Sequence, residues 1–116
     1  TGFLRPIDNP PALNRVDGGD IVGVRFEIFA GDKELTSTSY VQSVQQKQVA
    51  SSSCPGSVNG VAEPIKTDYG TSLRYNYNNG FFVDRWATPS DKTYLCYDLI
   101  VTTIDGNTLV AHFKFR

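Results

Sequence analysis

The chain has 116 residues, with 11 Lys and Arg against 12 Asp and Glu, so its net charge at neutral pH is -1. This length and composition fit one globular domain, and the near-balance of charge removes the electrostatic basis for binding nucleic acid or an anionic membrane surface. Its apolar runs, such as residues 99–101, are far shorter than the roughly 20 residues that span a bilayer. We therefore expect no nucleic-acid partner and no membrane insertion.

The first half of the chain predicts strands of unequal clarity. Residues 3–11 begin with a short apolar piece and carry three prolines, which predicts an edge strand or an extended entry because proline lacks the ladder N–H. Residues 21–29 alternate with a β-branched and aromatic apolar set, which indicates a half-buried strand. Residues 36–53 are mostly Ser, Thr and Gln with widely spaced valines, so we expect a polar connection with some strand.

Two hairpins are predicted in the second half. Residues 73–77 and 81–86 flank Asn79-Gly80, and residues 94–103 and 109–116 flank Asp105-Gly106. Glycine adopts the positive φ of a tight hairpin turn without Cβ strain. About seven short strands, with no capped segment of helical periodicity, predict an all-β fold of the β-sandwich type.

Alternation along these strands also predicts the core. One face of each strand collects the large apolar side chains, and Trp86 is expected on that face rather than at the surface. The residues expected in the core are Phe26, Ile28, Leu73, Tyr75, Trp86, Leu99, Phe113 and Phe115.

The two cysteines allow one intramolecular pairing. Cys54 lies in a loop-like Ser-Ser-Ser-Cys-Pro-Gly context, and Cys96 lies within a predicted strand. The alternatives are a disulfide, two buried thiols, or half of a metal site, and the last lacks the four ligands that structural zinc takes. The disulfide is favoured: it would remove roughly 4 kcal/mol of unfolded-chain entropy and would place the chain in an oxidising compartment, hence secreted or at the cell surface.

Motifs spread along the chain carry a family resemblance. The opening has Phe3, Pro6, Ile7, Pro10 and Pro11, and Asn14, Val16 and Gly18-Gly19 follow. Further matches are Leu73-x-Tyr75, Phe82-x-x-x-Trp86-x-Thr88, Cys96-x-x-Leu99, Asp105-Gly106 and Ala111-x-Phe113-Lys114-Phe115. In this order and spacing the chain resembles the PxKF domain of bacterial extracellular proteins. Gly23-Val24-Arg25-Phe26 stands at the naming motif, with Gly for Pro and Arg for Lys.

The resemblance implies an immunoglobulin-like antiparallel sandwich with one Cys-Cys bridge, here Cys54 with Cys96. It implies that residues 1–116 are a single domain appended to a larger secreted or surface protein, whose other domains are its partners. Some proteins that carry such domains also carry hydrolase domains. The family supplies no catalytic residues for this chain, so the expected role is an accessory, spacer or interaction module without catalysis.

The polar residues form no recognisable catalytic or metal-binding motif. The single histidine, His112, is expected to face solvent beside Lys114, and no Gly-x-Ser-x-Gly nucleophile elbow accompanies it. Asp17-Gly18-Gly19-Asp20 could offer oxygen ligands to calcium, but carboxylates beside Gly-Gly more often form a turn. We predict no metal site, no cofactor and no catalytic residue.

The aromatic side chains suggest an alternative function. Tyr75, Tyr77, Phe81 and Tyr97 crowd around the Asn79-Gly80 hairpin and the Cys96 strand. Exposed rings flanked by Asn and Asp are typical of polysaccharide-binding sandwiches, whereas a small core without Met also needs aromatic side chains. Three or more coplanar rings on a solvent-facing sheet would favour a carbohydrate-binding module, and scattered or buried rings would favour the spacer.

Overall fold

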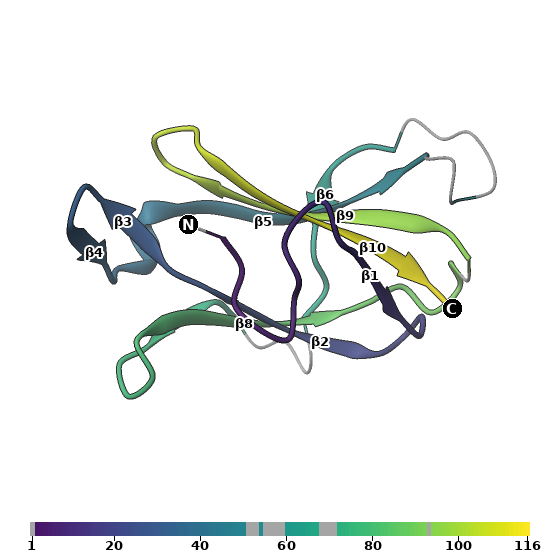
Figure 1. The fold of residues 1–116 in the computed structure, drawn as a ribbon, viewed down its shortest axis with the longest axis horizontal. Coiled ribbons are helices and arrows are strands. Elements are labelled where there is room, and N and C mark those ends of the chain that lie inside the picture. Colours follow the sequence, from purple (N-terminus) through teal and green to yellow (C-terminus); the bar gives the residue numbers. More distant parts are fainter. Residues whose placement is uncertain (1, 51–53, 55–59, 68–71, 93) are drawn as a thin grey trace.

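The structure is a computed structural model that describes residues 2–50, 54, 60–67, 72–92 and 94–116. Two β-sheets face each other, one of order β1-β10-β9-β5-β6 and one of order β2-β8-β7 (Figure 1). The strands of the larger sheet are β1 (Leu13–Val16), β5 (Val41–Val49), β6 (Glu63–Pro64), β9 (Cys96–Thr103) and β10 (Thr108–Phe115). Those of the smaller sheet are β2 (Ile21–Phe26), β7 (Arg74–Asn76) and β8 (Phe81–Ala87). A separate hairpin pairs β3 (Ile28–Ala30) with β4 (Lys33–Leu35), and a 3₁₀ turn, η1, covers Thr38–Tyr40.

The strand order is immunoglobulin-like. The strands β2, β8 and β7 occupy the places of B, E and D, and β5, β9 and β10 occupy those of C, F and G. All pairings are antiparallel except that of β1 with β10. The predicted all-β antiparallel sandwich with one disulfide is confirmed.

Both predicted hairpins are present. β7 and β8 join through a turn in which Gly80 has φ +79°, and β9 and β10 join through one in which Gly106 has φ +89°. These are conformations that residues with a Cβ rarely adopt. Both turns therefore lie where the Asn-Gly and Asp-Gly dipeptides predicted them.

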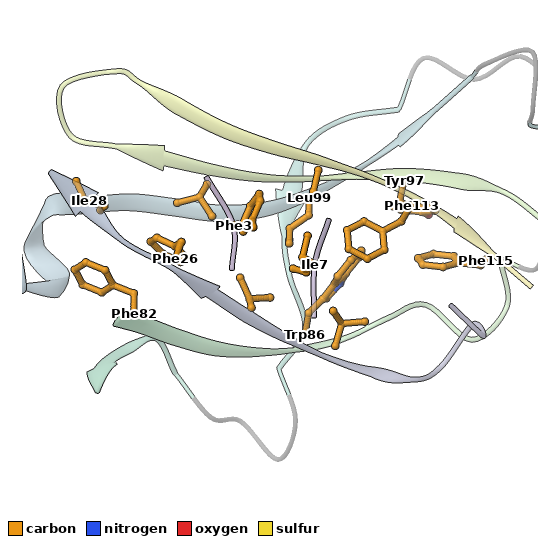
Figure 2. Packing of buried hydrophobic residues seen from close by; sticks show 14 residues of the cluster. Phe3, Ile7, Phe26, Ile28, Phe82, Trp86, Tyr97, Leu99, Phe113 and Phe115 are labelled. Carbon is orange, nitrogen blue, oxygen red and sulfur yellow. The ribbon is translucent and has the colours of Figure 1, made fainter. Parts of the chain in front are cut away.

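The space between the sheets is filled by the apolar faces of the strands (Figure 2). Phe26 stacks on Phe82 at a centroid distance of 5.3 Å, and Trp86 meets Phe113 edge-on at 5.0 Å. Six of the eight residues expected in the core are buried. The other two, Leu73 and Tyr75, are half-buried and pack against the cluster.

The N-terminal segment lies along one sheet edge and then crosses to the other sheet. Phe3 bridges to Phe26, and the Leu4 N–H donates to the Arg25 carbonyl at 2.8 Å. The side chain of Asn9 bonds both the N–H and the carbonyl of Phe3, each at 2.8 Å. The predicted edge position of this proline-rich segment is thus confirmed.

Two segments differ from the sequence prediction by more than a residue or two at their ends. The predicted strand over residues 21–29 divides at Glu27 into β2 and β3. The segment expected to be mainly a polar connection contains β5, a nine-residue strand paired with β9. Gln46 explains this, because its side chain points into the core: the Trp86 Nε1–H donates to its Oε1 at 2.8 Å, and its Nε2–H donates to Glu63 Oε1 at 2.8 Å. A buried glutamine of this kind breaks the apolar alternation that marks a strand.

The helical content of the described residues is the 3₁₀ turn η1. Within the described ranges, no helix has the length and apolar character needed to cross a membrane.

Candidate functional site

Of the four candidate binding rings, Tyr97 is in the core. Its exposed fraction is 4%, and its ring stacks on Phe115 with centroids 5.2 Å apart (Figure 2). Burial raises the pKa of its hydroxyl. This corrects its inclusion in a surface platform: strand β9 turns Tyr97 inward with Leu99 and Val101.

Tyr75 is half-buried and engaged on several sides. Its ring meets Phe82 edge-on at 5.0 Å and Tyr77 edge-on at 4.9 Å. Its hydroxyl donates to the Glu34 carboxylate, at 2.9 and 3.1 Å to the two oxygens. Burial, and then the hydrogen bond to Glu34, raise the pKa of Tyr75. The residue therefore ties the β3–β4 hairpin to β7.

The remaining two rings are more accessible. Tyr77 is 78% exposed in the turn after β7, and Phe81 is half-buried with the guanidinium of Arg25 5.6 Å from its centroid. The Tyr75 and Tyr77 planes are inclined at 69°. The four rings are thus divided between core, sheet edge and turn, and they do not form one coplanar platform.

A hollow lies at the end of the sandwich, where the sequence indicated a hairpin turn but no binding site. It has a volume of about 710 Å³ and lies between the β3–β4 hairpin and the β9–β10 turn. We call it the end groove. Ile28, Leu35 and Leu109 line it with apolar surface, and Asp105 and Asn107 add polar groups. Its volume is in the range of about 300–1,000 Å³ that ligand sites occupy.

The polar wall of the end groove is held by hydrogen bonds within the turn. The Thr103 hydroxyl donates to Asp105 Oδ1, and the Asn107 N–H and Nδ2–H donate to the same carboxylate at 3.2 and 3.0 Å. These bonds, led by that from Thr103, lower the pKa of Asp105. The turn is therefore a preformed edge, fixed before any ligand arrives.

The histidine has a partner that the sequence did not reveal. His112 Nδ1 lies 2.7 Å from Asp98 Oδ1, since the two residues are opposite each other on β10 and β9. His112 is partly exposed beside a smaller hollow of about 330 Å³ that Leu13, Val49 and Cys96 also line. Along the part of the chain that the structure describes, Asp98 is its sole side-chain hydrogen-bond partner. Among the described residues, no serine, threonine or cysteine side chain is bonded to His112 as the nucleophile of a catalytic triad would be.

Asp84 is a buried carboxylate on the core face of β8. It lies between Phe82 and Trp86 in sequence and is 5% exposed. Burial raises its pKa, while a hydrogen bond from the Arg85 N–H at 2.8 Å acts in the opposite direction. Burial, the larger of the two effects, therefore disfavours the ionised form of Asp84.

The segment Asp17-Gly18-Gly19-Asp20 forms a turn. The Asp20 N–H donates to the Asp17 carbonyl at 3.0 Å, and the Asp17 carboxylate lies 3.2 Å from Arg116 Nε. Among the residues with described positions, no three His, Cys, Asp or Glu side chains form a group suited to a metal ion.

Cys54 and Cys96 form a disulfide with Cα atoms 5.8 Å apart. The predicted pairing is confirmed. Cys96 begins β9, and Cys54 follows β5, which is the neighbour of β9 in the same sheet. The bridge therefore ties the segment after β5 to its own sheet.

A scan of the chain against protein-family models finds no match, and a search of curated proteins finds none either.

Proposed function

We propose that this chain is a non-catalytic, immunoglobulin-like accessory module of a larger secreted or cell-surface bacterial protein. Its role is to act as a spacer and to present an interaction surface to the other domains or to their partners. The resemblance to the PxKF domain and the single disulfide support this proposal. The proposal assigns no reaction to the chain.

The observation that carries the proposal is the placement of the aromatic side chains. Trp86, Phe113, Phe115 and Tyr97 join the two sheets, and Tyr75 fastens a hairpin to the smaller sheet. Rings used in this way stiffen the sandwich and are withdrawn from ligand contact. A spacer needs such stiffness, because it holds neighbouring domains at a fixed distance only if its own core has one packing arrangement.

Affinity electrophoresis through gels containing cellulose derivatives, xylan, starch, chitosan or peptidoglycan fragments tests the proposal. The chain should migrate at the same relative rate in every gel as in a gel without polysaccharide. Saturable retardation by one of them would overturn the spacer function in favour of carbohydrate binding.

Carbohydrate binding is the second candidate, and the exposure of Tyr77 favours it. A ring that is 78% exposed in a turn with Asn76, Asn78 and Asn79 could stack on a sugar ring beside amide groups. If retardation is observed, Tyr77→Ala should abolish it, and Tyr94→Ala, which removes another exposed ring, should leave it unchanged.

A further inference from the structure

The end groove is flanked by two apolar side chains that the fold leaves exposed. Phe29 in β3 is 46% exposed, and Ile104 in the β9–β10 turn is 60% exposed. Both line the groove, above a floor that includes Ile28 and Leu35. Figure 1 shows the β3–β4 hairpin and the β9–β10 turn at the same end of the sandwich. Exposed apolar residues that border a concave apolar surface are characteristic of interaction sites.

The hairpin beside the groove also has free strand edges. β3 and β4 form a two-stranded sheet, so neither has a second strand neighbour among the described residues. In the same part of the chain, Phe29 and Glu34 make no backbone hydrogen bond to another element. An open strand edge next to apolar pockets is the arrangement by which proteins add an extended peptide to a sheet.

The charge of the segments around the groove indicates what kind of peptide it would bind. Segments 27–35 and 103–109 contain four carboxylates, Glu27, Asp32, Glu34 and Asp105, against one cation, Lys33. Their net charge is -3 in a chain whose total is -1, which leaves +2 for the rest. The two segments that form the walls of the groove are therefore acidic and favour a cationic partner.

We propose that the end groove binds an extended segment of a partner protein in which lysine or arginine alternates with large apolar residues. The backbone of the segment pairs with the free edge of the β3–β4 hairpin. One apolar side chain enters the groove between Phe29 and Ile104, and the flanking cations lie near the acidic rim. The inference rests on the proposed function, because it names the surface through which the accessory module interacts.

The probe is the peptide acetyl-Gly-Lys-Phe-Lys-Ile-Lys-Val-Lys-Gly-amide, titrated into the ¹⁵N-labelled chain of residues 1–116. Its counterpart has Glu in place of each Lys. The lysine peptide should bind saturably and shift the amide resonances of Phe29, Glu34, Ile104 and Asn107. The glutamate peptide should not bind, because its charge matches that of the rim.

Two pairs of variants locate the site. Ile104→Ser should weaken binding by about tenfold or more, the effect of removing a central apolar contact. Val61→Ser, a change at a residue that is 82% exposed and outside the groove lining, should leave the affinity unchanged. Asp32→Lys should weaken binding and reduce its dependence on salt, whereas Asp91→Lys, at an exposed site between β8 and β9, should not.

Other results would contradict the proposed peptide site. The inference would be overturned if both peptides bound equally, or if no shift appeared at millimolar peptide. It would also be overturned if the shifts centred on Tyr77 or on another region outside the groove. Shifts of the groove amides with protein concentration alone would assign the groove to a second copy of the chain and also overturn it. Failure of the peptide to bind leaves the spacer function intact, because retardation by a polysaccharide is a separate test of that function.

Discussion

Replacing Gln46 with leucine should destabilise the sandwich although it makes the core more apolar. The side chain is 5% exposed and accepts the hydrogen bond of the Trp86 indole at 2.8 Å. Leucine has a similar volume and cannot accept, so the indole N–H would be buried without a partner. An unpaired buried donor costs about 1–3 kcal/mol, and the extra apolar burial offsets part of it, which leaves a net loss of about 1–2 kcal/mol.

The assay is thermal and urea unfolding, followed by the fluorescence of the chain's single tryptophan and by far-UV circular dichroism. For 116 residues, a loss of 1 kcal/mol lowers Tm by about 4 °C, so Gln46→Leu should lower it by about 4–8 °C. The matched control is Gln45→Leu, on the opposite face of the same strand, which should change stability by less than about 0.5 kcal/mol.

A double-mutant cycle isolates the hydrogen bond. In the Trp86→Phe background no indole N–H remains, so Gln46→Leu should lose most of its effect there, with a coupling of about 1 kcal/mol or more. If Gln46→Leu is neutral or stabilising in the wild-type background, or if the two changes are additive, then the reasoning that the glutamine is retained to satisfy Trp86 is wrong.

Three further predictions concern stability. Replacing Cys54 and Cys96 with alanine removes a cross-link across 42 residues, and chain entropy predicts a loss of about 4 kcal/mol, or about 16 °C in Tm; an unchanged Tm would refute the stabilising role. Because the raised pKa of Asp84 means that the folded state holds its proton more tightly than the unfolded chain, stability should fall as the pH rises through the interval between the two pKa values. Asp84→Asn should remove that fall and raise Tm at pH 7, and an equally steep profile in the variant would contradict it. Asn9→Ala removes two hydrogen bonds to Phe3 and should cost about 1–2 kcal/mol in urea unfolding; no change would show that the N-terminal segment is held by other contacts.

Strong alternation made most of the fold predictable. Strands β9 and β10 carry apolar residues at alternate positions over most of their length, so the sequence alone indicated both strands and the buried face of β10. Asn79-Gly80 and Asp105-Gly106 located the two turns, since Gly80 and Gly106 have positive φ. The presence of only two cysteines left one pairing to choose.

Long-range polar contacts explain the parts that the sequence did not predict. Gln46 is a polar residue at a core position, and its partner Trp86 is 40 residues away. The Asp98–His112 pair depends on the register of β9 against β10. A local pattern contains no information on either, so β5 looked like a connection and His112 looked unpartnered.

The candidate site was harder to predict than the fold. Tyr75 and Tyr97 are both tyrosines in predicted strands, and only the packing distinguishes the half-buried ring bonded to Glu34 from the buried ring stacked on Phe115. The end groove has no motif, because segments more than 60 residues apart in the chain form its two walls. A local signal for it is Phe29, an aromatic residue on the polar side of the alternation, close to Asp32 and Glu34 in the sequence.

Native-state hydrogen exchange tests most directly whether this chain is one rigid module. In one rigid module, the slowest amides of β2 and β8 should exchange with the same free energy as those of β9 and β10, and this value should equal the free energy of global unfolding. Exchange of the whole β2-β8-β7 sheet at a free energy several kcal/mol below that of the larger sheet would contradict it. Such a sandwich could not serve as a spacer or hold the end groove in shape.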